Sequence, residues 1–264
     1  MSDAVRFGYA DTVLGQVHYA EAGAGEPLLC LHQTPRSWDE YRELLPLLAG
    51  QHRVVAMDTL GMGASAPPQG VASIEAYAAG AAALVDALDL GPVAVMGHHT
   101  GGVIALELAA SRPELVRRLV LSSTPWVDAA SRQRRAGRPP IDQVEVADDG
   151  SHLVELWRRR QAFYPPGRPD ILERFVRDAL AARDPEEGHL AVGRYRMEDR
   201  VGLVTAPTLS IGASGDPHAF PDHPRLAAAL VDVTTAVIDG GTVALLEERA
   251  DDVAPLVLDF LRAR

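Results

Sequence analysis

The sequence contains no lysine, and all 25 of its basic residues are arginines. Without a lysine amine, the chain cannot form a Schiff base with a carbonyl substrate or hold pyridoxal phosphate covalently. The 36 acidic residues leave a formal net charge of −11, and this surplus of negative charge disfavours nucleic acid as a partner. The composition therefore excludes one class of cofactor and argues against one class of macromolecular partner.

Cysteine and long apolar runs are also scarce. Cys30 is the single cysteine, so no internal disulfide can form, which fits a reducing compartment. No apolar stretch reaches the length of a membrane span, and the first residues lack the basic and apolar regions of a secretory signal. We therefore expect a cytoplasmic protein of bacterial type with no membrane partner, and the sequence leaves a homodimer open.

Short apolar runs alternate with helical patterns along most of the chain. Each run is nearly continuous in apolar character, as expected for strands that are covered on both faces. The runs are Leu28–Leu31, Val54–Met57, Val93–Met96, Leu119–Ser122, Thr208–Ile211 and Thr235–Ile238, and an edge hairpin is expected around Val13–Glu21 with its turn at Gly23–Gly25. Helical spacing of apolar residues marks Trp38–Leu48, Ile74–Leu88, Thr100–Ser111 and Asp252–Arg262. This alternation predicts an α/β protein with a mostly parallel central sheet and helices on both faces.

One segment, residues 126–203, breaks this alternation. It has the pattern of helices without intervening strands, with candidates at Leu153–Phe163, Asp170–Arg183 and Glu186–Met197. An all-helical insertion between two strands is typical of a lid over a binding site. We therefore expect a core formed by residues 1–125 and 204–264, with a helical lid, residues 126–203, inserted after the sixth strand.

The motif Gly97-His98-His99-Thr100-Gly101 lies between an apolar run and a helix rich in alanine and leucine. A strand that enters a tight, glycine-bounded turn and leaves it as a helix is the local structure of a nucleophile elbow. Gly97 and Gly101 allow strand and helix to approach closely around a strained central residue. The side chain of His99 then projects above the sheet, where the free N–H groups of the helix N-terminus also point. The motif therefore predicts an elbow with a histidine at its centre.

Three further stretches, in their order and spacing, resemble the α/β-hydrolase fold family over nearly the whole chain. Leu29–Pro35 (LCLHQTP) is similar to the family's strand-end LHGxP loop, which supplies an oxyanion-hole N–H. Met57–Ser65 (MDTLGMGAS) is similar to its D-x-x-G-x-G-x-S turn, and Ile211–Pro217 (IGASGDP) to the strand-end segment that bears the catalytic acid. The resemblance implies an α/β-hydrolase fold, with the helical segment as its lid.

The resemblance also implies three catalytic positions, and the sequence departs from the family at two of them. The nucleophile position holds His99 instead of Ser, Cys or Asp, whereas the acid position holds the expected Asp216. The position of the general-base histidine, in a GGH pattern after the last strand, holds Thr242, and Gln33 replaces the glycine of the LHGxP loop. Because a serine triad needs a hydroxyl nucleophile and a separate imidazole, we do not expect an acyl-serine mechanism.

The remaining groups suit base catalysis. An ordinary imidazole, with a pKa of about 6.5, is a competent base near neutral pH. We expect His99 to deprotonate a water or a substrate, Asp216 to orient His99 or a water, and Thr242 to complete a polar chain. The backbone N–H groups of Thr34 and Thr100 would form an oxyanion hole, in which each donor contributes about 3 kcal/mol.

These expectations lead to two functional hypotheses. The first is a cofactor-independent enzyme that acts on a small, largely apolar molecule with a carbonyl group, by hydrolysis without an acyl-serine, by lyase chemistry or by cyclisation. The second is a non-catalytic pseudoenzyme that holds a ligand in the same lidded pocket. Turnover and its dependence on His99 separate the two.

The sequence also leads to expectations for several other side chains. The expected pocket contacts are Gln33, His98, Trp126, Trp157 and Tyr195, although a structural role is favoured for His98. His218 is an alternative base, and Glu107 is expected on an exposed helix face. No metal site is expected, because the adjacent residues His98 and His99 point apart on a turn.

Overall fold

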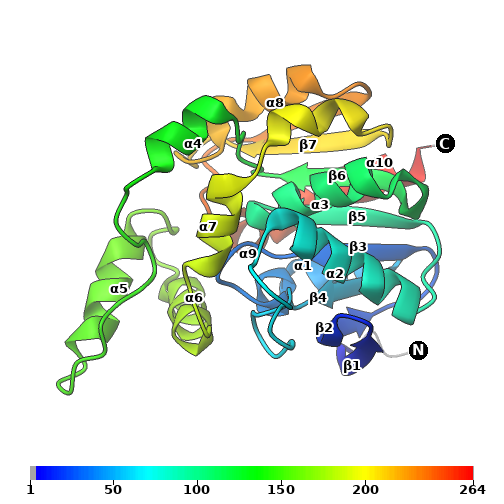
Figure 1. Ribbon diagram of the computed structural model, residues 1–264. Helices are drawn as coiled ribbons and strands as arrows, with labels where there is room; N and C mark the ends of the chain where they lie inside the picture. The colour runs from blue at the N-terminus through cyan, green and yellow to red at the C-terminus, as the bar shows by residue number, and fades with distance from the viewer. Residues whose placement is uncertain (1–3, 264) are drawn as a thin grey trace.

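An eight-stranded sheet forms the centre of the computed structural model, which describes residues 4–263 (Figure 1). The strand order is β1-β2-β4-β3-β5-β6-β7-β8. Only the pairs β1–β2 and β2–β4 are antiparallel, and all other neighbours are parallel. The strands are β1 Arg6–Thr12, β2 Gly15–Ala22, β3 Pro27–Leu31, β4 Arg53–Met57, β5 Val93–His98, β6 Val116–Ser122, β7 Thr208–Ala213 and β8 Val233–Ile238. The predicted α/β-hydrolase fold, with its mostly parallel sheet, is confirmed.

Helices cover both faces of this sheet, and each face has its own apolar core. Strand alternation divides β5 between the cores, since Val93 and Val95 belong to one and Ala94 and Met96 to the other. The first core includes α2 Ile74–Ala87, α3 Thr100–Ser111 and part of α8 His223–Ala229, and the second includes α1 Leu44–Ala49, α9 Leu245–Glu248 and α10 Ala250–Arg262. Within residues 4–263, no helix combines the length and hydropathy that a membrane span requires.

Four helices lie between β6 and β7, in the segment predicted as a lid. They are α4 Ala129–Arg135, α5 Ser151–Gln161, α6 Pro169–Ala181 and α7 Glu187–Arg194. Together they gather at one end of the sheet (Figure 1). A small third core joins α5 and α6 to the loop after β8 through Leu156, Phe175 and Ala244. The helical insertion therefore packs against loops that follow the carboxyl ends of the parallel strands.

The N-terminal hairpin turns at a different place from the one expected. Its turn lies between β1 and β2 at Val13 and Leu14, where the Thr12 hydroxyl donates to the Gly15 carbonyl and accepts from the Leu14 N–H. The prediction of a turn at Gly23–Gly25 was wrong because β1 presents its large apolar side chains to solvent. Its pattern therefore lacked the buried face that marks a strand.

The helix expected over Trp38–Leu48 is divided into two parts. A 3₁₀ turn spans Trp38–Tyr41, and α1 begins only at Leu44. Pro46 explains the division, since in a continuous helix it would lack an N–H donor and its ring would clash with the carbonyl of Arg42.

Candidate active site

The turn at His99 has the strand–turn–helix geometry that its sequence predicts. β5 ends at His98, α3 begins at Thr100, and His99 between them has φ +47° and ψ −115°. A Cβ atom on Gly97 would lie 2.1 Å from the Gly101 carbonyl oxygen, and one on Gly101 would lie 1.9 Å from the Leu31 carbonyl oxygen. Backbone contacts on both sides therefore require glycine, and they hold the central residue in place whatever its side chain.

The imidazole of His99 faces the carboxylate of Asp216, which lies in the loop after β7. His99 Nε2 is 2.8 Å from Asp216 Oδ2, an ion-pair distance, although the ring N–H does not point squarely at the oxygen. The other carboxylate oxygen accepts the N–H groups of His218 at 2.8 Å and Ala219 at 3.3 Å. Both side chains are largely buried, with His99 9 % and Asp216 1 % exposed.

The charge state of Asp216 follows from these contacts. Burial alone would raise the pKa of its carboxyl group, but the facing His99 imidazole and the His218 N–H lower that pKa to about 2. Asp216 is therefore an anion at neutral pH. Its partner His99 makes no hydrogen bond through Nδ1 within residues 4–263, so this ring nitrogen is available to another group.

In the part of the chain that the structure describes, the backbone N–H groups of Thr34 and Thr100 are unpaired. Thr100 is the first residue of α3, so its N–H has no partner within the helix. The N–H of Thr34, in the loop after β3, donates to no group within residues 4–263. The two loops touch, because a Cβ on Gly101 would contact the carbonyl groups of Leu31 and His32. This pair of free donors is what an oxyanion hole requires.

Thr242 is not joined to His99 or Asp216 by a hydrogen bond within residues 4–263. Its hydroxyl accepts from the Ala244 N–H at 3.2 Å, and its own N–H donates to Glu248 Oε1 at 2.5 Å. The polar chain predicted through Thr242 is therefore not formed. The reason is local, because a threonine hydroxyl readily bonds the backbone two residues further along its own turn.

His98 has a structural position beneath the turn. Its side chain is fully buried, with Nδ1 3.0 Å from Ser122 Oγ and Nε2 2.9 Å from the Val243 carbonyl oxygen. The pKa of His98 is lowered to about 3, mainly because the ring is buried and to a smaller extent because His99 lies next to it. Both ring nitrogens have protein partners, so the expectation that His98 contacts a ligand was wrong and the favoured structural role stands.

Two further pocket candidates have their polar groups bound elsewhere. The Gln33 side chain donates to Glu40 Oε1 at 2.6 Å, and the Tyr195 hydroxyl donates to Glu107 Oε2 at 2.7 Å. Glu107 itself is buried instead of exposed, because Arg200 at the end of the helical insertion pairs with it at 2.8 Å. The expectation of an exposed Glu107 was wrong, since its counter-charge comes from a residue 93 positions away.

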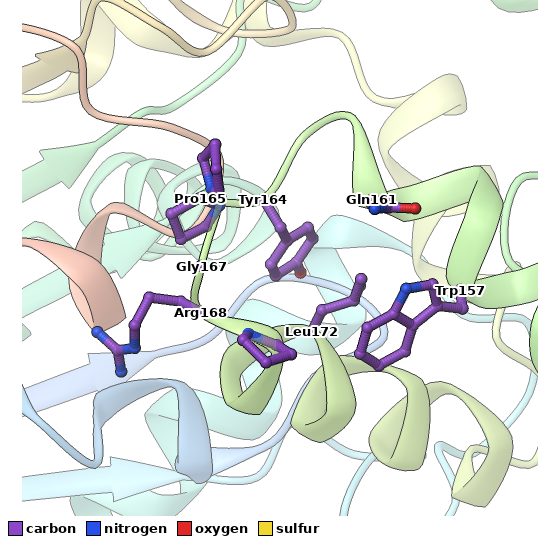
Figure 2. Close-up of a pocket in the computed structure, with 9 residues that line it drawn as sticks. Trp157, Gln161, Tyr164, Pro165, Gly167, Arg168 and Leu172 are labelled. Atoms are coloured by element: carbon purple, nitrogen blue, oxygen red, sulfur yellow. The ribbon is translucent and has the colours of Figure 1, made fainter.

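The two candidate tryptophans, Trp126 and Trp157, lie in different surroundings. Trp157 lines a pocket of about 200 Å³ between α5 and α6, together with Tyr164 and Leu172 (Figure 2). None of the elbow residues lines this pocket. Trp126 is buried beneath the guanidinium of Arg225, which lies 4.8 Å from its ring centre. Trp157 therefore lines a pocket that no elbow residue lines, and Trp126 packs against Arg225.

His218 remains close to the site without occupying the base position. Its backbone N–H donates to Asp216, while its ring lies 4.6 Å from the ring of Phe163 in the helical insertion.

Among residues 4–263, no group of three or more histidine, cysteine or acidic side chains is arranged to hold a metal ion.

A buried ionic cluster, which no sequence pattern predicts, lies beside the loop that carries Thr34. Arg36 is completely buried and pairs with Glu247, 211 positions later in the chain. Glu40, also buried, accepts two hydrogen bonds from Gln33. The only available signal was the density of charged residues next to the LHGxP-like loop, and a linear pattern does not pair residues so far apart.

Comparison with known proteins places this geometry in a family. A soluble epoxide hydrolase from Corynebacterium sp. (strain C12) is 39% identical over 106 residues, which cover 40% of this chain and 37% of that protein. Haloalkane dehalogenase 2 from Mycobacterium tuberculosis is 28% identical over 265 residues, covering 94% of this chain and 92% of that one. Both relatives are enzymes of the hydrolase type.

Solved structures give the same result for the fold. A hydrolase from Pseudomonas aeruginosa PA01 superimposes with a TM-score of 0.81 at 23% identity, over 98% of this chain and 99% of that one. The sequence profile of the α/β hydrolase fold matches residues 26–248. The chain therefore belongs to the α/β hydrolase fold family.

Proposed function

We propose that the protein is a cofactor-independent enzyme that acts on a small, largely apolar molecule with a carbonyl group, and that His99 is its general base. The observation that carries this proposal is the 2.8 Å contact between His99 Nε2 and Asp216 Oδ2 at the centre of the elbow. Within residues 4–263, Nδ1 of His99 has no hydrogen-bond partner, and the N–H groups of Thr34 and Thr100 are unpaired as well. The imidazole thus occupies the place where the family carries its nucleophile.

The roles of the groups follow from their charges. Asp216, an anion, accepts from the Nε2 side and stabilises the imidazolium that forms when Nδ1 takes a proton. In hydrolysis, Nδ1 takes a proton from water while the hydroxide adds to the carbonyl carbon. The resulting oxyanion accepts from the N–H groups of Thr34 and Thr100, and its collapse expels the leaving group, which recovers the proton from His99.

The same arrangement supports abstraction of a proton from a carbon next to the carbonyl group. In that case the two N–H donors stabilise an enolate instead of a tetrahedral intermediate. Elimination and ring closure both begin with this step, so the site accommodates lyase and cyclase chemistry as well as hydrolysis. An acyl-serine intermediate has no place in the scheme, because no hydroxyl stands at the centre of the elbow.

Substitution of His99 tests the proposal. Wild-type protein is assayed with dihydrocoumarin, phenyl acetate and acetylacetone, following hydrolysis by absorbance and deuterium exchange of the diketone by NMR. We expect His99→Ala to lower turnover on the order of 10²-fold or more, the usual contribution of a general base. Asp216→Asn should act in the same direction, because it removes the charge that stabilises the imidazolium.

Two controls sharpen this test. His218→Ala removes a nearby imidazole, and turnover should stay within about threefold of wild type if His99 is the base. A fluorophosphonate probe should leave the wild-type protein unlabelled. Turnover that survives His99→Ala, or covalent labelling by the probe, contradicts the proposal, and no turnover of any of the three compounds favours a ligand-binding pseudoenzyme.

A further inference from the structure

A buried arginine joins the loop after β3 to the helical insertion. The guanidinium of Arg36 donates to both carboxylate oxygens of Glu247, at 2.9 and 3.0 Å. Its Nε donates to Asp178 Oδ2 of α6 at 2.9 Å, and the Ser37 hydroxyl donates to the same oxygen at 3.1 Å. One carboxylate on α6 therefore holds two consecutive residues of the loop.

The other side of the loop is fixed by Glu40. The backbone N–H of Gln33 donates to Oε2 of Glu40 at 2.8 Å, and the Gln33 side chain donates to Oε1 at 2.6 Å. Burial raises the pKa of Glu40 to about 7, although the neighbouring Arg36 opposes this shift. A carboxylate is expensive to bury, so its place here is explained by the conformation it imposes. Thr34 thus lies between two anchored neighbours, Gln33 and Arg36.

Both α6 and α7 rest on this loop. Arg174, one turn before Asp178 on α6, reaches Glu43 at 2.7 Å and Glu247 at 3.2 Å. Gly188 of α7 lies so close that a Cβ atom on it would be 2.2 Å from Thr34 Oγ1. Both helices of the insertion are therefore packed against the loop that carries Thr34.

We propose that Asp178 is a positioning residue: through Arg36 and Ser37 it holds residues 33–37 so that the Thr34 N–H faces the reacting oxygen. The oxyanion hole is then complete only when α6 is seated, and closure of the lid and assembly of the site are one event. This inference rests on the proposed function, since it takes the Thr34 N–H as an oxyanion donor. Asp178 itself does not touch the reacting atoms.

Amide hydrogen exchange of the full-length protein tests the coupling without a substrate. In Asp178→Asn, the protected amides of Gln33 and Arg36 should exchange at least tenfold faster than in wild type, although residue 178 is more than 140 positions away. On whichever of the three assay compounds is turned over, kcat should fall about tenfold while KM changes less than twofold. Asp178→Glu, which keeps the charge, should recover part of both effects.

Two variants serve as matched controls. Asp170→Asn lies in the first turn of the same helix, where the carboxylate is exposed and pairs with Arg168. Glu198→Gln removes a pair with Arg132 elsewhere in the insertion. Exchange in residues 33–37 should match wild type in both. If Asp178→Asn does not fold, Ser37→Ala removes one of the two bonds to Asp178 and should give a smaller rise.

The outcomes separate this inference from the proposed function. Unchanged exchange at residues 33–37 in Asp178→Asn, or an equal rise in Glu198→Gln, overturns the coupling even where His99→Ala abolishes turnover. Faster exchange in Asp178→Asn together with full turnover by His99→Ala leaves the coupling of α6 to the loop standing. In that case the catalytic role of the loop is what fails.

Discussion

The turn at His99 and the loop at Thr242 occupy two positions at which the family resemblance places catalytic side chains. At the first, the backbone of the elbow is kept and the side chain is changed, so an imidazole stands in contact with Asp216 at 2.8 Å. At the second, the side chain is changed and its hydroxyl is used within its own loop, 3.2 Å from the Ala244 N–H. The first side chain contacts Asp216, and the hydroxyl of the second is bonded within its own loop.

The difference has a physical cause. The elbow is held by contacts between backbone atoms, since Gly97 and Gly101 have no room for a Cβ, and these contacts do not depend on the residue between them. In the loop after β8, an added Cβ on Gly241 would instead come closest to a side chain, that of Leu245 at 2.6 Å, and the short side chain of Thr242 accepts from a backbone N–H of its own loop. The turn at His99 can therefore present a different side chain while its own backbone stays unchanged.

The largest effect is expected from a substitution that disrupts the turn at His99. Gly101→Ala would place a Cβ 1.9 Å from the Leu31 carbonyl oxygen, which cannot move without shifting the sheet. We expect a loss of roughly 3 kcal/mol or more in the free energy of unfolding, measured by urea denaturation. Gly193→Ala on α7 is the control, because nothing lies within 4 Å of its added Cβ. A Gly101→Ala protein as stable as Gly193→Ala would contradict the close packing.

A smaller effect, which depends on pH, is expected from His98, the residue that links the two regions through Ser122 and the Val243 carbonyl. Its pKa is lowered in the folded protein to about 3, first by burial, so between that value and about 6.5 the unfolded chain binds a proton that the folded one does not. Stability from His98 is therefore present above about pH 6.5 and lost as the pH falls. The loss between pH 7 and 5 should be about 2 kcal/mol.

Urea denaturation of wild type and His98→Gln at the two pH values measures this contribution. The variant lacks the titrating ring, so the stability advantage of the wild type should shrink by that amount at pH 5. An advantage that is the same at both values would mean that His98 is not held neutral in the folded protein.

Much of the structure around the turn at His99 could be predicted from the sequence, because the residues that determine it lie close together in the chain. Two glycines around His99 and the order of the strand-end motifs were enough to place His99 and Asp216 together. The buried pairs Glu107–Arg200 and Arg36–Glu247 could not be predicted, since each joins segments far apart in the chain and depends on how the helical insertion packs. The N-terminal turn was misplaced because β1 exposes Phe7 and Tyr9, so its pattern lacks a buried face.

The smallest effect is expected from Thr242. Thr242→Ala removes the hydroxyl that accepts from the Ala244 N–H, which should lower the free energy of unfolding by about 0.5–1 kcal/mol. Turnover should stay within about twofold of wild type, because this hydroxyl forms no bond to His99 or Asp216 within residues 4–263. Thr242→Ser keeps the hydroxyl and should match wild type in both measurements. A fall in kcat of more than tenfold in Thr242→Ala that is recovered in Thr242→Ser would instead show that the hydroxyl takes part in the reaction. Both loops would then contribute side chains to catalysis.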